Sequence, residues 1–130
     1  MKTAVLVCVL AAFLATGAQA QIHVTQDAQG RTTSISGLYA DHTCSVRPLT
    51  GKVVKRDFEN DGTTLKDFVV EHTDGTREYV NVDAPTGLDM ATGRAIYDGL
   101  QRLTKVGRRV GGKVLACGVA GTVMAVETIR

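Results

Sequence analysis

A single helical pattern set between strand-like segments restricts the fold of this chain more than any other feature. From about Asp89, apolar residues recur at three- and four-residue intervals, as on one face of an amphipathic helix. They are Leu88, Ala91, Ala95, Ile96, Gly99, Leu100, Leu103 and Val106. Thr86 and Asp89 have the spacing of a capping box, and Lys105 and Gly107 are typical of a helix end. The sequence therefore predicts one helix in a chain that is otherwise extended.

The clearest strand pair is a hairpin around Asp74-Gly75. A two-residue turn would place Glu71 opposite Glu78, which brings two negative charges together. A three-residue loop, with the glycine in the left-handed conformation, instead pairs Glu71 with Arg77. Opposite charges favour the three-residue loop.

The same register sorts the hairpin side chains between two faces. Phe68 lies beside Val80, and Val70 and Val82 share their face, so a continuous apolar face points to the core. Tyr79 and Val69 are then expected on the outer face.

Two further extended regions flank this unit. In residues 49–59 the apolar face begins with Leu49, Gly51 and Val53 and then shifts to Val54, Arg56 and Phe58. This slip of one residue predicts a β-bulge. Residues 108–117 and 122–129 read as a C-terminal strand pair. Residues 21–47 have weaker strand signals and fit either a hairpin or a loose arm.

The first twenty residues are typical of a secretory signal peptide. Lys2 precedes an apolar run from Val5 to Ala15, and Ala18-Gln19-Ala20 is a cleavage site of the A-x-A type. The alternative is an uncleaved anchor, but the run is shorter than the roughly 20 residues that span a bilayer. We therefore expect cleavage after Ala20 and a periplasmic or secreted product.

Export leaves Cys44 and Cys117 as the two cysteines of the mature chain. An even pair in an oxidising compartment is expected to form a disulfide. The alternative is a nucleophilic pair of Cys44 with the nearby His42, but no motif around Cys44 supports it.

Charge is balanced overall but separated along the chain. Between Asp57 and Asp89 there are nine acidic residues against two basic ones, and between Arg94 and Lys113 there are six basic residues against one acidic one. One interpretation is that the two segments pack side by side and offset each other. The other is an anionic ligand bound by the basic segment. The residues for that ligand would be Arg102, Lys105, Arg108, Arg109 and Lys113.

The order of three strands, a helix and two strands resembles the OB-fold, a small Greek-key barrel. The resemblance covers residues 49–129 and includes Gly51-Lys52-Val53-Val54 and the segment 106–114. It implies an all-β fold with one helix: a five-stranded OB-like Greek-key barrel, the helix between strands 3 and 4, and an N-terminal extension. The domains are then a signal peptide (1–20), an N-terminal arm or hairpin (21–47) and the barrel (48–130). In such barrels the first strand lies beside the fourth, which would bring Cys44 close to Cys117.

Two exported groups are similar in size and element order. One comprises the small periplasmic OB-fold proteins of Gram-negative bacteria. The other comprises the pentameric binding subunits of bacterial enterotoxins, which also tie an N-terminal cysteine to the strand after the helix. This chain has a longer segment before Cys44 and no tryptophan to stack on a sugar ring. No glycan-binding residue is therefore carried over.

The sequence contains no pattern that predicts catalysis, a metal site or a cofactor. His23, His42 and His72 lack metal-ligand spacing, and Thr50-Gly51-Lys52 lacks the other residues of a phosphate-binding loop. Nucleic acid is an unfavourable ligand because the predicted second and third barrel strands are acidic and aromatic-poor. We expect no catalytic residue, no metal and no cofactor.

These observations predict a non-enzymatic exported binding or stress-accessory protein whose ligand, partner and oligomeric state the sequence does not identify. The alternative is an oligomeric glycan-binding subunit resembling the enterotoxin subunits. The candidate binding residues lie on the outer face of the second and third barrel strands and on nearby loops, a surface that is equally consistent with a solvated sheet face. They are Arg56, Asn60, Glu71, Arg77 and Tyr79.

Overall fold

The structure is a computed structural model, and it describes residues 22–38, 44–83, 87–117 and 121–129. The expected signal peptide and its cleavage site, Thr86 of the expected capping box, and His42 lie outside the described residues. None of the helices in the described part of the chain has the length and apolar character needed to span a membrane.

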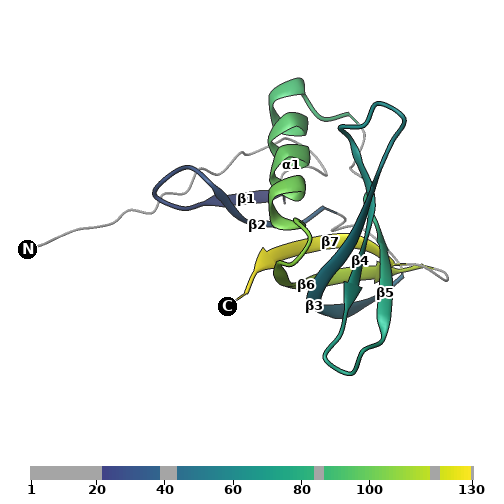
Figure 1. The fold of residues 1–130 in the computed structure, drawn as a ribbon. Helices are drawn as coiled ribbons and strands as arrows, with labels where there is room; N and C mark the ends of the chain where they lie inside the picture. Colours follow the sequence, from purple (N-terminus) through teal and green to yellow (C-terminus); the bar gives the residue numbers. More distant parts are fainter. Residues whose placement is uncertain (1–21, 39–43, 84–86, 118–120, 130) are drawn as a thin grey trace, which may run out of the picture.

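The described residues form seven strands and one helix (Figure 1). Their bounds are β1 His23–Gln26, β2 Thr32–Ser36, β3 Ser45–Phe58, β4 Leu65–Glu71, β5 Arg77–Asn81, α1 Met90–Leu103, β6 Arg109–Ala116 and β7 Gly121–Thr128.

Five of the strands close into a barrel. Neighbouring strands follow the order β7-β5-β4-β3-β6, and β6 also pairs with β7. The seam between β5 and β7 is parallel and short, with Val80 opposite Gly121 and Asn81 opposite Thr122. The expected mostly-β fold with one helix and a closed five-stranded barrel is therefore confirmed.

The N-terminal residues form two strands of their own. β1 and β2 make an antiparallel hairpin, and β2 continues the sheet beside β7, where Ile35 lies opposite Val126. In the complete strand order α1 consequently follows the fifth strand, β5, and precedes β6. The expected position of the helix between strands 3 and 4 is therefore wrong, because β1 and β2 precede the five barrel strands and the helix follows the fifth strand of the chain.

The β4–β5 hairpin has the predicted three-residue loop. Glu71 lies opposite Arg77 and Phe68 opposite Val80. Gly75 has a φ of 89°, the left-handed conformation that this loop requires. Val69 and Tyr79 lie opposite each other on the outer face, as predicted. Val69 is nevertheless only 2% exposed because Lys55 and Tyr79 flank it across the neighbouring strands.

The predicted bulge in β3 is also present. The pairing of β3 with β4 shifts register between Val53 and Lys55. Leu49 and Val53 are fully buried before the shift, and Phe58 packs against the core after it. The bulge keeps apolar side chains on the inner face while the long strand bends around the barrel.

Helix α1 packs its buried face on the sheet and the β1–β2 hairpin (Figure 1). Asp89 is the N-cap and accepts a hydrogen bond from the Thr92 amide at 2.8 Å. The predicted capping box, with Asp89 inside the first turn, is therefore wrong. The helix ends at Leu103, so Val106 is 61% exposed instead of buried. A Cβ at Gly99 would lie 2.8 Å from the Ile35 side chain, which explains the glycine.

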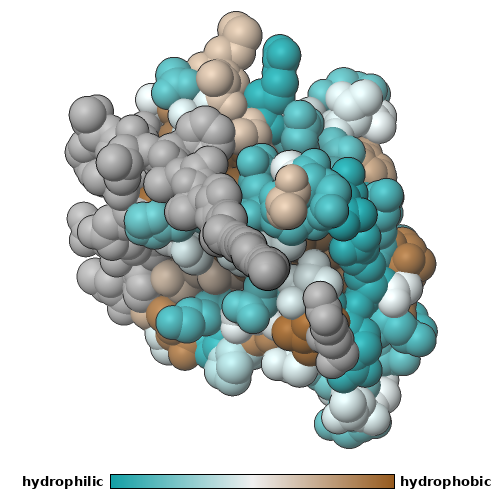
Figure 2. Space-filling model, turned by 90° about the vertical axis from the view of Figure 1, so that its left-hand side faces the viewer, coloured by the Kyte–Doolittle hydropathy of each residue, from teal (hydrophilic) through white to brown (hydrophobic). Residues whose placement is uncertain are grey.

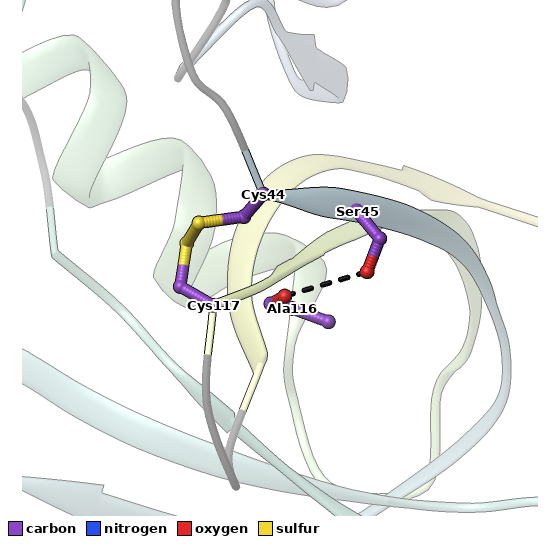
Figure 3. Close-up of a disulfide and its surroundings, with 4 residues drawn as sticks. All are labelled: Cys44, Ser45, Ala116 and Cys117. Atoms are coloured by element: carbon purple, nitrogen blue, oxygen red, sulfur yellow. Dashed lines mark hydrogen bonds between the residues drawn. A yellow bond between two sulfur atoms is a disulfide. The ribbon is translucent and has the colours of Figure 1, made fainter.

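A disulfide joins Cys44 to Cys117, as predicted (Figure 3). It connects the start of β3 to the end of β6, where Ser45 lies opposite Ala116 in the antiparallel ladder. The Ser45 hydroxyl donates to the Ala116 carbonyl at 3.4 Å beside it. The Cα atoms of the two cysteines are 4.9 Å apart, so the ladder itself brings them within bonding reach.

Candidate binding face

The exposed sides of β3, β4 and β5 form a regular surface, which we call the outer face. Strand pairing places its side chains in three cross-strand rows because residues that lie directly opposite one another point to the same side. The rows are Lys52–Glu71–Arg77, Lys55–Val69–Tyr79 and Asp57–Asp67–Asn81.

Three of the five predicted binding residues meet on this face. Arg77 Nε lies 3.2 Å from Glu71 Oε2, and the pair is exposed enough to be screened by solvent. Tyr79 occupies the next row and is 60% exposed. An aromatic ring thus stands on a sheet surface beside a carboxylate and a guanidinium group.

The structure separates the other two predicted residues from this face. Arg56 belongs to the inner face, as the one-residue slip in residues 49–59 predicts, so its grouping with the outer-face candidates is wrong. Its Nη1 donates to the Gln101 carbonyl at 3.0 Å, and its guanidinium lies 5.1 Å from the centroid of the Phe58 ring. The bulge in β3 turns Arg56 inward. Asn60 is exposed in the turn after β3.

Sequence reasoning missed a carboxyl pair on the outer face. Asp57 and Asp67 lie directly opposite each other on β3 and β4. Burial and the neighbouring Asp57 carboxyl raise the pKa of Asp67. The raised pKa favours the protonated form of the Asp67 carboxyl. The sequence did not predict this pair because Asp57 lies opposite Asp67 only as a result of the bulges in β3.

A second missed cluster lies beside the β4–β5 turn, at the end of the sheet away from α1 (Figure 1). The Glu78 carboxylate is 2.7 Å from Arg47 Nη2 and 3.0 Å from His72 Nε2. His72 Nδ1 lies 2.9 Å from the Thr50 carbonyl oxygen. Both ring nitrogens therefore lie within hydrogen-bond distance of oxygen atoms.

This cluster ties β3 to the hairpin and leaves no ring nitrogen of His72 for a substrate. The predicted register contained a signal for it. His72 and Glu78 lie diagonally across the hairpin on the inner face once Phe68 is opposite Val80. The sequence did not predict that Arg47 belongs to this cluster, because that depends on how β3 pairs with its neighbouring strands.

The other perturbed carboxylates stabilise turns. Hydrogen bonds from Thr64 lower the pKa of Asp61 to about 2. The Asp74 carboxylate accepts from the amide and hydroxyl of Thr76, which lower its pKa as well. Turns of this kind are a common use of aspartate and imply no ligand.

Two open grooves lie elsewhere on the surface. One, of about 540 Å³, crosses β6 where Gly111 and Gly112 lack side chains, and Lys113 and Glu127 flank it. The other, of about 530 Å³, runs along α1 and is lined by residues that include Arg94 and Tyr97. Neither groove contains any of the five predicted binding residues. The outer face is therefore not part of either groove.

Within the described ranges, no three histidine, cysteine, aspartate or glutamate side chains are grouped to hold a metal ion. Comparisons with protein-family models, with curated proteins and with solved structures find no match to this chain.

Proposed function

We propose that this chain is an exported, non-enzymatic binding protein built on an OB-like barrel, and that it contacts its ligand through the outer face. A stress-accessory role is one form of such a function. The observation that carries the proposal is the exposure of Tyr79, at 60%, in the middle row of that face.

An exposed aromatic ring on a rigid sheet is suited to binding. Its two side-chain torsions lose little entropy on contact, and its ring supplies a large apolar area with a polar end. The Glu71–Arg77 pair in the adjacent row adds charges of both signs. Because neither groove includes this face, an extended or polymeric ligand fits it better than a small enclosed molecule.

The arrangement of titratable groups supports binding rather than catalysis. Asp89, which lines the groove along α1, is engaged as the helix cap. His72 is engaged at both ring nitrogens. A catalytic site would need a cavity that brings together several titratable groups with perturbed pKa.

The strand pairing supports the OB-like interpretation of the barrel. The first barrel strand, β3, lies beside the fourth, β6, as in the fold that the element order resembles. Export is supported by the disulfide, since such bonds persist in oxidising compartments.

The test is a binding screen with two probe sets, a glycan array and a phage-displayed peptide library. The exported wild-type protein is compared with Tyr79→Ala and with Met90→Ala. Met90 is 80% exposed on α1 and serves as the control for loss of a large exposed apolar side chain. We expect probes selected by the wild type to bind Tyr79→Ala at least about tenfold more weakly, as an aromatic hot spot does, and to bind Met90→Ala unchanged.

Unchanged affinity of the selected probes for Tyr79→Ala would exclude the outer face. The absence of any selective probe in either set would count against a binding role.

The alternative, an oligomeric glycan-binding subunit, differs in assembly. Size-exclusion chromatography with light scattering on the exported protein would show a pentamer for that alternative. A monomer would remove it and leave the primary proposal intact.

A further inference from the structure

Five cations meet where the connection from α1 to β6 runs along β3. They are Lys52, Lys55, Lys105, Arg108 and Arg109, and we call them the basic junction. The Val53 amide donates to the Arg108 carbonyl at 2.9 Å, and the Gly107 amide donates to the Val53 carbonyl at 2.8 Å. Lys52 lies directly opposite Arg109 in the β3–β6 ladder. These backbone contacts bring cations from segments far apart in the sequence close together.

The connection itself is a tight turn that projects an apolar side chain. The Arg108 amide donates to the Lys105 carbonyl at 3.0 Å, and Gly107 has a φ of 96°. Val106 sits inside this turn between the two cations and is 61% exposed. The turn thus presents a valine flanked by positive charge.

The acidic side chains that the structure describes near the junction form no ion pairs with its cations. In the described part of the chain, no ion pair within 4.0 Å involves any of the five. Glu71, which lies opposite Lys52 on β4, is paired with Arg77 instead. The charge of Lys55 favours the ionised Asp67 carboxyl, but the two side chains form no ion pair.

The ion pairs also test whether the acidic and basic segments of the sequence neutralise each other by direct contact. No ion pair among the described residues joins the acidic segment 57–89 to the basic segment 94–113, so direct pairing does not offset them. The structure also regroups the basic residues. Arg102 is half-buried on α1 and Lys113 borders the groove over β6, whereas Lys52 and Lys55 from β3 join the cluster.

We propose that the basic junction, with Val106 at its tip, docks the protein on the surface of an anionic lipid bilayer. A bilayer interface offers negative headgroups for the cations and an apolar boundary for an exposed valine. A soluble polyanion would use the cations but gives no role to Val106. The basic junction shares Lys52 and Lys55 with the outer face but includes none of Glu71, Arg77 and Tyr79, so the Tyr79→Ala test of the ligand face and the vesicle test of the junction can fail separately.

Binding is measured by flotation with vesicles of phosphatidylcholine alone or mixed equally with phosphatidylglycerol. The exported protein is used, and its N-terminus is read by mass spectrometry. We expect binding to the mixed vesicles that weakens steeply with added salt, because the attraction is screened. Each cation near an anionic surface contributes about a fivefold gain in partitioning.

The double variant K52E/R109E is expected to bind mixed vesicles at least about 25-fold more weakly, from the loss of two such contributions. The matched control is K66E/R94E, which has the same net charge and changes exposed cations outside the junction. We expect the control to stay within about threefold of the wild type. Circular dichroism verifies that each variant is folded.

The valine is tested by Val106→Ser against Met90→Ser, because Met90 is exposed but lies on α1 outside the junction. We expect Val106→Ser to lose several-fold in partitioning and Met90→Ser to lose none. Equal binding of the wild type and K52E/R109E overturns the proposal. So does binding to soluble polyphosphate without binding to mixed vesicles, which would assign the junction to a polyanion in solution.

Discussion

Replacement of both Cys44 and Cys117 with alanine removes the covalent link between the start of β3 and the end of β6 (Figure 3). The two residues are 73 positions apart, so the disulfide closes most of the barrel sequence into one loop. In the chain-entropy model, a loop of that length restricts the unfolded chain by about 4 kcal/mol. We expect the double variant to lose roughly that much free energy of unfolding.

The measurement is thermal and urea unfolding followed by far-UV circular dichroism, since the chain has no tryptophan. A domain of this size has an unfolding entropy of about 0.2 kcal/mol/K, so the melting temperature should fall by about 20 °C. Ser45→Ala is the matched control because it removes only the long hydrogen bond to Ala116 beside the disulfide. Its free energy of unfolding should change by less than about 0.5 kcal/mol.

A loss below about 1 kcal/mol in the double variant would refute this reasoning. It would mean that the β3–β6 ladder holds the two ends together in the unfolded ensemble as well, so that the covalent link restricts little.

Three further predictions concern single positions. Gly112→Ala should prevent stable folding, since its Cβ would lie 2.7 Å from a backbone carbon of β7, whereas Gly111→Ala meets only side-chain atoms closely and should remain folded by circular dichroism. Asp67→Asn should stabilise the protein at pH 7 by up to about 1 kcal/mol by removing like charge opposite Asp57. Because its pKa is raised in the folded state, wild-type Asp67 contributes stability at acidic pH that is lost as pH rises, so urea titrations at pH 4 and 7 should show the gain only at pH 7. Glu78→Ala should cost about 1–3 kcal/mol in urea unfolding because it leaves two partly buried donors without their acceptor, and an unchanged midpoint would show that the cluster is dispensable.

The surface on the side of the β1–β2 hairpin contains both hydrophilic and hydrophobic residues (Figure 2). On the face shown in Figure 2, hydrophilic residues surround several separate hydrophobic patches. The β1–β2 hairpin lies on this side of the molecule (Figure 1).

The strand pairing of the β1–β2 hairpin follows from the Asp27-to-Gly30 turn, where the Asp27 carboxylate accepts from the Gln29 and Arg31 amides at 2.9 Å. Turn chemistry in the sequence was enough to suggest this hairpin but not its attachment to β7.

Local patterns were sufficient where a few neighbouring residues decide the outcome. The register of the β4–β5 hairpin followed from Gly75 and from the choice between Glu71–Glu78 and Glu71–Arg77 pairs. The bulge in β3 followed from the one-residue slip of its apolar face. These features depend on turn geometry and side-chain alternation, which act over ten residues or fewer.

The candidate site shows where local patterns stopped being sufficient. Glu71, Arg77 and Tyr79 share a face because one hairpin register places them there, so the sequence could group them. The predicted bulge placed Arg56 on the apolar face, but its hydrogen bond to Gln101 of α1 depends on the tertiary structure. The Asp57–Asp67 pair had no signal of its own among the many carboxylates of the chain.

The sequence by itself determined the helix, the strands from residue 49 onward, the hairpin loop, the strand bulge and the pair of cysteines that form the disulfide. Only the tertiary structure decided that Lys52 and Lys55 join Arg109, that Arg47 reaches Glu78, and that β1 and β2 extend the sheet. The physical reason is range. Periodicity and turn residues fix the backbone locally, whereas the neighbours of a strand are set by the closure of the barrel around its buried core, which no short segment encodes.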